Sequence, residues 1–322
     1  MRSDRIDGSR AILTQQRKRL DGIGAARHHA RHSEDRPMTL SAYSEIPPPG
    51  FQRRRIETPA GMMALWERDA GGPALVLLHG NTASKCAFRS LLAEPALAPF
   101  RLIALDLIGA GESGRANAPE RDYTMPGMAR TLMAALEELN CEDAAVLGWS
   151  LGGHIAIEAA GQGAKFRAMI LTGTPPCGPG AEEILSVFTP SDLTAVVTGE
   201  APPPELVWQY VHALYGSSKA IPEEFFAAAD RFDGRMRRIF SEHFLMSDEV
   251  KPQRRVVAEW PKPIAVIEGE EEPFFDARSL DALAWKNLWR GKVQMIAGSG
   301  HAPFFEQRAR YAALLAEFLN GL

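Results

Sequence analysis

The sequence predicts an α/β protein in which a mostly parallel central sheet carries helices on both faces and a helical cap is inserted. Three observations lead to this class. Short apolar runs without a polar break, such as residues 74–78 and 101–105, are typical of strands buried on both faces. They alternate with stretches whose apolar residues recur at helical spacing, such as residues 124–139. The alternation stops over residues 178–258, which hold helix-like stretches and no apolar strand run.

The expected elements follow one another in a simple order. Residues 51–57 and 62–67 are two strands joined by a Pro-Ala-Gly turn, expected to pair antiparallel at a sheet edge. Further strands are expected at residues 74–78, 101–105, 144–149, 166–172, 263–268 and 292–296. Helices are expected from about residue 85 to 98, over 124–139, after residue 150, after residue 275 and from about 305 to 319. Parallel sheets bind ligands at the carboxyl ends of their strands, so the site is expected in the loops that follow them.

The sequence divides into four segments. Residues 1–42 are expected to form a disordered basic leader, because the stretch before Met38 holds nine Arg or Lys against five Asp or Glu. Met38 is a candidate for the biological start. Residues 43–177 and 259–322 are expected to form the two parts of the α/β core, and residues 178–258 form the cap.

Composition narrows the possible partners. A net charge of −4 on 322 residues gives no reason to expect nucleic acid or a membrane as partner. The scattered Cys86, Cys141 and Cys177 suggest buried thiols in a reducing compartment, so a cytoplasmic location is expected. The glycine-rich loop 106–114 lacks the Gly-Lys-Ser/Thr ending of a phosphate-binding loop. We see no Cys, His and carboxylate set at metal-ligand spacing, so neither a cofactor nor a metal is expected.

The strand at residues 144–149 leads into a Gly-x-Ser-x-Gly turn centred on Ser150, and a helix follows. Gly148 and Gly152 lack Cβ atoms, which lets strand and helix approach closely while Ser150 takes a strained conformation. The turn exposes the serine oxygen at the sheet edge, where the amino end of the helix favours a developing negative charge. This pattern predicts a nucleophile elbow.

A serine hydroxyl is a poor nucleophile at neutral pH, so it needs a base and a third group that orients the base. His301 follows the last predicted strand and is the expected base for Ser150. The acid is expected after the preceding strand, and Glu272 stands three residues past the strand-ending Gly269. Asp276 is the alternative acid. The chain order Ser, acid, His is the order of the α/β-hydrolase arrangement.

An oxyanion hole requires donors directed at the developing alkoxide. The backbone N–H of Leu151, directly after the nucleophile, is one expected donor. Asn81, after His79 and Gly80 at the end of an inner strand, is the expected second donor, and its carboxamide can also hold a substrate carbonyl. His79 itself is expected to be a structural hydrogen-bonding residue.

The chain resembles the α/β-hydrolase-fold N-acyl-homoserine lactone lactonases, metal-independent serine enzymes that open the lactone ring of bacterial quorum-sensing signals. The resemblance covers roughly residues 51–318. It is carried by GWSLGGHI at 148–155, TGTPP at 172–176, DGR at 233–235, RRI at 237–239, EPF at 272–274, NLW at 287–289 and GHAPF at 300–304.

The resemblance implies an activity and several site residues. It implies Glu272 as the triad acid, Asn81 as the residue after His-Gly, and Tyr210 as a cap tyrosine that contacts substrate. It also implies a quorum-quenching reaction through an acyl-enzyme on Ser150 that yields an N-acyl-homoserine. The acyl chain is expected to lie against apolar cap residues and Trp149.

Several alternatives remain open at this point. A general carboxylesterase or another lactone hydrolase would use the same triad with a different pocket. An acylase would cut the amide of the same signals, and a non-catalytic member would only bind them. Ser150 excludes the haloalkane dehalogenases and epoxide hydrolases of this fold, which need a carboxylate at that position. The sequence indicates neither the preferred acyl-chain length nor the oligomeric state.

Overall fold

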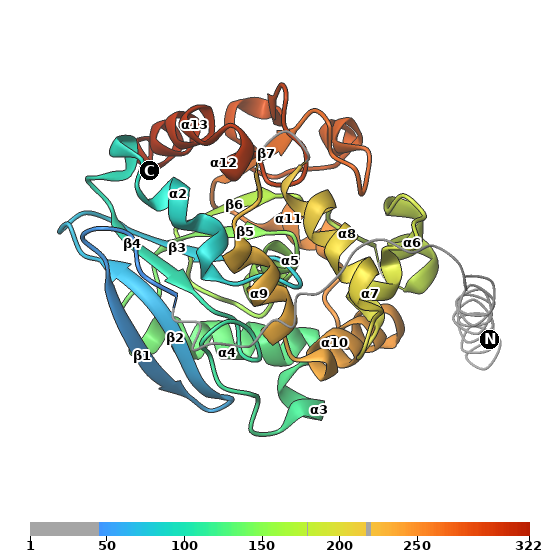
Figure 1. Cartoon of the computed structure of the whole chain (residues 1–322). Helices are drawn as coiled ribbons and strands as arrows, with labels where there is room; N and C mark the ends of the chain where they lie inside the picture. Colours follow the sequence, from blue (N-terminus) through green and yellow to red (C-terminus); the bar gives the residue numbers. More distant parts are fainter. Residues whose placement is uncertain (1–44, 179, 217–219) are drawn as a thin grey trace. The chain divides into compact units, whose positions relative to one another are not determined.

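The computed structural model describes residues 45–322, except residues 179 and 217–219 (Figure 1). Its centre is an eight-stranded sheet with the order β1-β2-β4-β3-β5-β6-β7-β8. The strands are β1 (Gln52–Thr58), β2 (Gly61–Arg68), β3 (Ala74–Leu78), β4 (Arg101–Leu105), β5 (Ala145–Trp149), β6 (Ala168–Thr172), β7 (Ile264–Gly269) and β8 (Gln294–Ile296). The β1–β2 and β2–β4 pairs are antiparallel and the others parallel, so the predicted mostly parallel sheet is confirmed.

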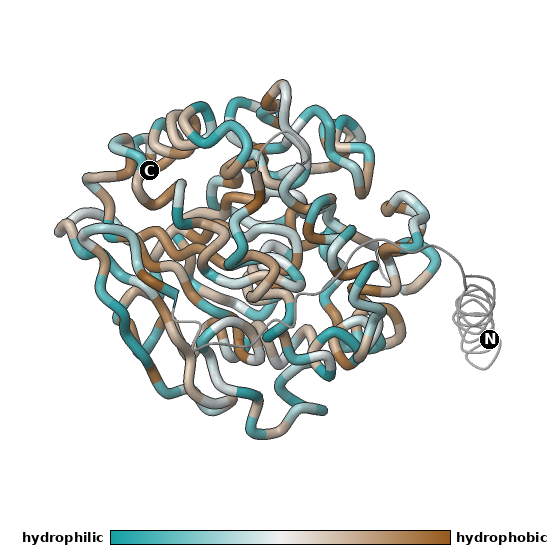
Figure 2. The backbone as a smooth tube through the Cα atoms, in the orientation of Figure 1, coloured by the Kyte–Doolittle hydropathy of each residue, from teal (hydrophilic) through white to brown (hydrophobic). Residues whose placement is uncertain are grey.

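The pattern of burial explains which strands lie inside the sheet. Strand β1 at the edge exposes its first four residues, whereas every residue of β5, β6 and β7 is buried. Figure 2 shows the same contrast, with hydrophobic backbone gathered on the central strands and a largely hydrophilic β1. A strand with helices on both faces needs apolar side chains at every position, which is why its sequence reads as an unbroken apolar run.

Helices fill the connections between the strands. Those before β6 are η1 (Lys85–Phe88), α2 (Arg89–Leu92), η2 (Pro95–Leu97), α3 (Pro119–Asp122), α4 (Met125–Glu138) and α5 (Leu151–Gly161). Between β6 and β7 lie α6 (Ala181–Val187), α7 (Thr194–Thr198), α8 (Pro204–Tyr215), α9 (Glu223–Arg231), α10 (Gly234–Met246) and α11 (Gln253–Glu259). After β7 come η3 (Ala277–Ala282), η4 (Trp289–Gly291), α12 (Pro303–Glu306) and α13 (Arg308–Asn320).

Two apolar clusters pack on opposite faces of the sheet. Successive side chains of a strand point to opposite faces, and β5 accordingly sends Val146 into one cluster and Leu147 into the other. The first cluster includes Leu132 of α4 and Ile155 of α5, and the second includes Leu315 of α13. Helices therefore cover both faces, as the sequence predicts.

Three predicted helices differ from the structure. The expected helix over 85–98 is broken into η1, α2 and η2, because Pro95 lacks an N–H and Glu94 before it is extended (φ −70°, ψ 128°). The helix expected after residue 275 is only the short η3, and the closing helix begins at Arg308 after the separate α12.

Some predictions concern parts of the chain beyond the described residues. The basic leader, residues 1–42, lies outside them. Among the described residues, six helices lie between β6 and β7, where the cap is predicted. The boundaries of the cap at 178 and 258 stay a prediction. Within residues 45–322, apart from the gaps named above, we find no helix with the length and apolar character needed to cross a membrane.

Candidate active site

Ser150 occupies the turn between β5 and α5, with φ 52° and ψ −117°. A positive φ is costly for a residue with a side chain, and the neighbouring glycines make the turn possible. A Cβ on Gly148 would stand 2.4 Å from the Cα of Gly153, and one on Gly152 would stand 2.3 Å from the carbonyl oxygen of Leu78. Close approach of helix and strand thus requires glycine at both positions, as the elbow predicts.

His301 and Glu272 form a direct contact on the same edge. His301 Nδ1 lies 2.7 Å from Glu272 Oε2, and the two side chains are 3% and 1% exposed. The second carboxylate oxygen, Oε1, accepts a hydrogen bond of 2.9 Å from the backbone N–H of Phe274. A carboxylate beside Nδ1 keeps the proton on that nitrogen, so Nε2 carries the lone pair that a general base needs. His301 Nε2 is buried and has no hydrogen-bond partner among the described residues.

The backbone and ring of His301 are held from several sides. Trp149 Nε1 donates to the carbonyl oxygen of His301 over 2.9 Å. The rings of Trp149 and Phe274 lie 5.7 and 4.7 Å from the imidazole, between ring centres. On the remaining side, a Cβ at Gly173 would stand 2.6 Å from His301 Cε1. Tight surroundings of this kind leave the imidazole one orientation.

Asp276, the alternative acid, has a different position. Its side chain is exposed, and its Oδ1 accepts a hydrogen bond of 3.0 Å from the backbone N–H of Arg278. It therefore caps η3. The structure brings Glu272 to His301, and Asp276 serves the start of a 3₁₀ helix.

The two expected oxyanion donors lie directly after Ser150 and in the loop that follows β3. Leu151 is the first residue of α5, so its N–H has no acceptor within the helix. Asn81 follows the end of β3, and the preceding Gly80 lies against the elbow, where an added Cβ would stand 3.2 Å from Ser150 Cβ. The carboxamide of Asn81 accepts a hydrogen bond of 2.9 Å from Thr82 Oγ1 and donates over 3.4 Å to Val197 O.

Tyr210 and Trp149 have different surroundings. Tyr210 comes from α8, is buried, and its ring lies 5.7 Å from that of Phe274, which packs on His301. Burial raises the pKa of Tyr210, opposed by the charge of Arg237 and assisted by that of Glu272. Trp149 is fully buried and fixes the His301 loop. Contact of either side chain with substrate stays a prediction.

His79 and His154 have structural partners. His79 Nε2 accepts the N–H of Leu107 over 3.0 Å, and its Nδ1 lies 2.8 Å from Gly80 O. His154 Nδ1 lies 2.9 Å from Gln253 Oε1, which joins α5 to α11. Burial lowers the pKa of each imidazole to about 4, against the hydrogen bond that each one makes. Both rings are therefore neutral at physiological pH.

Glu268 is a buried carboxyl that our sequence reasoning missed. Its Oε2 accepts the N–H of Gly173 over 2.7 Å, while Oε1 is buried without a hydrogen-bond partner in the described part of the chain. Burial raises the pKa of Glu268 well above its ordinary value, and the nearby Glu272 raises it further. A buried carboxyl group with a raised pKa thus holds the backbone of Gly173, which lies against His301. Its signal in the sequence was a charged residue at the end of an apolar strand.

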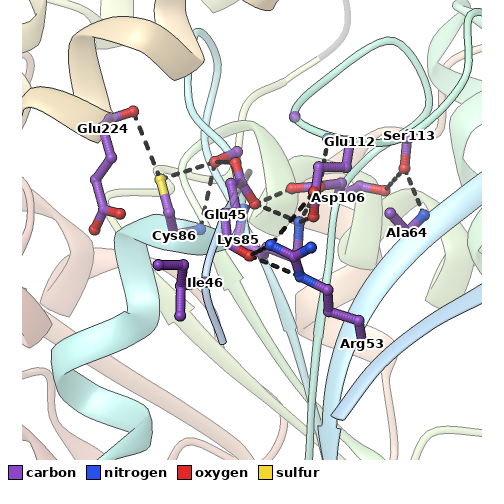
Figure 3. Close-up of polar contacts among 12 residues, drawn as sticks. Glu45, Ile46, Arg53, Ala64, Lys85, Cys86, Asp106, Glu112, Ser113 and Glu224 are labelled. Atoms are coloured by element: carbon purple, nitrogen blue, oxygen red, sulfur yellow. Dashed lines mark hydrogen bonds and ion pairs between the residues drawn. The ribbon is translucent and has the colours of Figure 1, made fainter. Parts of the chain in front are cut away.

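A buried ion network lies on the neighbouring loops (Figure 3). Carboxylate oxygens of Glu45, Asp106 and Glu112 lie within 4.8 Å of one another, the spacing of a metal site. However, Lys85 Nζ contacts all three, at 2.5 Å from Asp106 Oδ2, 2.9 Å from Glu112 Oε2 and with an ion pair to Glu45. The ammonium already contacts the carboxylates that a metal ion would need, so the cluster is a salt-bridge network.

Comparison with known proteins agrees with this geometry. A parallel sheet that carries a serine on a strand–turn–helix elbow is the framework of a hydrolase. A family model described as the alpha/beta hydrolase family matches residues 75–314, and the chain belongs to this family. The predicted fold class is thereby confirmed.

Individual relatives are more informative about chemistry. A variant of the N-acyl homoserine lactonase AidH, solved with N-hexanoyl homoserine, is 34% identical with a TM-score of 0.80, covering 84% of this chain and 97% of that one. AidH with N-butanoyl homoserine is 35% identical with a TM-score of 0.79, covering 83% and 96%. The pimeloyl-[acyl-carrier protein] methyl ester esterase of Aeromonas hydrophila is 27% identical over 250 residues, 75% of this chain and 85% of the esterase. The chain is therefore a hydrolase with lactonase and esterase relatives.

Proposed function

We propose that this enzyme opens the lactone ring of N-acyl-homoserine lactones with Ser150, His301 and Glu272 as its triad. The observation that carries the proposal is the 2.7 Å contact between His301 and Glu272 on the edge where the Ser150 elbow stands. It is supported by similarity to AidH over nearly the full length of that protein. The product would be the N-acyl-homoserine, and the biological effect would be quorum quenching.

The acylation step follows from the arrangement of the donors. Ser150 Oγ attacks the lactone carbonyl while His301 Nε2 takes its proton, and the Glu272 carboxylate stabilises the imidazolium that forms. The carbonyl oxygen gains negative charge and is met by the N–H of Leu151 and by Asn81. The tetrahedral intermediate then collapses, the ring C–O bond breaks, and His301 returns its proton to the leaving alkoxide.

Deacylation faces a competitor that linear esters do not have. The leaving hydroxyl stays tethered to the acyl group, because both belonged to one ring. Water activated by His301 must attack the acyl-enzyme before this hydroxyl closes the ring again. Proton transfer through the same imidazole then releases Ser150 and the carboxylate product.

The remaining parts of the proposal concern binding and location. We propose that Tyr210 contacts the substrate and that the acyl chain lies against apolar cap side chains and Trp149. Cys86, Cys141 and Cys177 are buried free thiols, which suits a reducing cytoplasm. We propose a small acyl lactone or ester as the partner, and we propose no role for nucleic acid, a membrane, a metal or another cofactor.

A general carboxylesterase is the second candidate function. The similarity to the methyl ester esterase of Aeromonas hydrophila favours it, because linear esters need the same triad. The ratio of kcat/KM for an acyl-homoserine lactone to that for a simple aryl ester separates the two candidates. A lactonase should favour the lactone.

Mass spectrometry of N-hexanoyl-homoserine lactone incubated with chelator-treated enzyme tests the proposal. We expect a mass gain of one water that acid reverses, and no change with the Ser150→Ala variant. Release of free fatty acid would instead show an acylase. Unchanged lactone together with rapid aryl-ester hydrolysis would favour the carboxylesterase, and binding without any turnover would identify a non-catalytic member.

A further inference from the structure

A chain of hydrogen bonds connects a cap arginine to the candidate oxyanion residue. Arg237 Nε on α10 donates to Thr82 Oγ1 over 3.1 Å, and Thr82 Oγ1 donates to Asn81 Oδ1 over 2.9 Å. Arg237 and Thr82 are 5% and 1% exposed, so water does not compete for these bonds. Two segments far apart in the sequence thus meet at the loop that follows β3.

The chemistry of the three groups sets the direction of this chain. A guanidinium can only donate hydrogen bonds, so the hydroxyl of Thr82 must accept from Arg237. The single hydroxyl hydrogen then points to Asn81, and it needs the carboxamide oxygen and not the NH₂ group. Asn81 is thereby held with its NH₂ group free of Thr82. That group makes only a long bond of 3.4 Å to Val197 O of α7 within the described chain, so a substrate oxygen can replace it.

Thr82 has an unfavourable backbone conformation. Its φ is 60°, in the left-handed region that glycine and asparagine tolerate. A β-branched residue at positive φ is a genuine outlier and is costly for the fold. Glycine would remove the strain but would also remove the hydroxyl. The strained backbone of Thr82 therefore suggests that its hydroxyl has a role, and that hydroxyl contacts Asn81.

Arg237 is buried without a carboxylate partner among the residues that the structure describes. No carboxylate among the described residues lies within ion-pair distance of its guanidinium; its other contacts are Ala229 O at 3.0 Å and the ring of Phe232 at 4.9 Å. Burial lowers the pKa of Arg237 to about 10, with Tyr210 and Asp230 opposing the shift. The side chain remains a cation at neutral pH and polarises the Thr82 hydroxyl toward Asn81.

We propose that Arg237 and Thr82 are positioning residues that orient the Asn81 carboxamide as an oxyanion and carbonyl donor. This inference rests on the proposed function of Asn81 and names the cap as part of its support. The cap would then contribute to the rate of acyl transfer as well as to substrate binding.

Substitution of Thr82 separates the hydroxyl from the shape of the side chain. Thr82→Val keeps the β-branch and the backbone strain but cannot accept or donate a hydrogen bond. We expect kcat to fall about 10- to 100-fold with KM nearly unchanged, because oxyanion donors act in the transition state. Thr82→Ser keeps the hydroxyl and should retain a near wild-type kcat. Equal loss in both variants would overturn the inference.

Arg237 has a matched control beside it on the same helix. Arg238 pairs instead with Glu200 and Glu242 on the surface. Arg237→Met should lower kcat about 10-fold or more, whereas Arg238→Met should leave it unchanged. Thermal unfolding of both variants shows whether a loss reflects unfolding. A similar kcat in the two variants would contradict the proposed role of Arg237 in orienting Asn81 through Thr82.

A double-mutant cycle tests whether the effect passes through Asn81. In an Asn81→Ala background the Thr82→Val change should add little, because its target is gone. Full additivity of the two losses would overturn the inference. This cycle does not involve Arg237, so it remains a test even if Arg237→Met fails to fold.

The readout must also distinguish this inference from the proposed function. We would measure turnover of p-nitrophenyl butyrate and N-hexanoyl-homoserine lactone, and the rate of Ser150 labelling by a fluorophosphonate. If the wild type is labelled and hydrolyses only the ester, the lactonase proposal fails. Slower ester hydrolysis by Thr82→Val would then still support the positioning role of Thr82 and Arg237. If the wild type is not labelled at all, both fail together.

Discussion

At the scale of single residues, Glu268 and Glu272 lie on one sheet edge, yet their carboxyls have different partners. Glu272 receives hydrogen bonds from His301 Nδ1 and the Phe274 N–H. Glu268 has one oxygen without a partner among the described residues, and burial raises its pKa. This difference lets Glu272 serve His301 while Glu268 holds Gly173.

Replacement of Glu272, the proposed triad acid, should reduce the rate with little effect on the fold. Glu272→Gln keeps the size of the side chain but presents an NH₂ or a neutral oxygen to His301. We expect kcat to fall about 10²- to 10⁴-fold, because the imidazole loses its orienting charge. Asp276→Asn, at the capping position of η3, is the matched control and should keep its rate. The hydrolysis rates of the two variants decide between the two candidate acids. Slow hydrolysis by Asp276→Asn together with fast hydrolysis by Glu272→Gln would assign the acid to Asp276.

At the scale of elements, helix α5, which follows Ser150, is connected to α11 in the region of the predicted cap. His154 on α5 contacts Gln253, the first residue of α11, and the same Gln253 oxygen accepts the Cys177 N–H over 3.2 Å. The His154 ring also lies against Phe188 and Phe244, at 6.3 and 5.3 Å between centres. A buried imidazole therefore joins the elbow helix to the helices that follow β6.

This contact should make stability depend on pH. The pKa of His154 is about 4 in the fold, below its ordinary 6.5, because burial disfavours the charged ring. The folded state binds this proton less well than the unfolded state, so the contribution is present above pH 6.5 and is lost as pH falls toward 4. Comparison of the wild type with the His154→Gln variant isolates the contribution of His154 to the free energy of unfolding. The difference in unfolding free energy should shrink by about 2 kcal/mol from about pH 7.5 to about pH 5 in urea titrations. A difference independent of pH would contradict this.

At the scale of the whole described chain, the Lys85 network ties the segment before β1 to the loops of the sheet. Glu45 reaches Lys85 from 40 residues upstream, and Ser84 Oγ donates to Glu45 Oε1 over 2.6 Å. Burial raises the pKa of Glu45 to about 7, with Asp106 adding to the shift and Lys85 opposing it. Removal of Glu45 would take away one acceptor of the buried Lys85 ammonium and the carboxylate acceptor of the Ser84 hydroxyl.

Truncation should show where the required chain begins. A chain that starts at Met38 keeps Glu45, and we expect wild-type activity and stability from it. A chain that starts at Phe51 loses Glu45 and leaves Lys85 with two carboxylates. We expect it to be less stable by on the order of 3 kcal/mol in urea denaturation. Glu45→Gln in the full chain checks that the carboxylate is responsible, and an unaffected Phe51 chain would show that the network does not contribute.

Much of the core and of the candidate site could be predicted because each feature is local. Apolar runs mark the inner strands, and Ser150 and His301 directly follow such runs. The proximity of Glu272 to His301 followed from its spacing past Gly269. Their catalytic roles stay predictions.

The features that were missed depend on contacts between distant parts of the chain. Lys85 reads as an ordinary polar residue after Ser84, and nothing in the sequence marks Glu45 as its partner. Thr82 is unfavourable at positive φ, so local propensity argues against the conformation that it adopts. The break in the helix over residues 85–98 is different, because the Glu94–Pro95 pair was a visible signal that a single long helix could not continue.

The three free thiols provide a built-in probe of local opening. Cys86 lies beside the Lys85 network, Cys141 lies between α4 and β5, and Cys177 lies next to α11. Burial raises the pKa of each thiol, and only an exposed thiolate reacts with an alkylating reagent. Each cysteine can therefore be modified only when its own surroundings open. The alkylation rate of each cysteine under native conditions would therefore report how often the region around it opens. The three rates can be measured on the wild-type protein without introducing a probe.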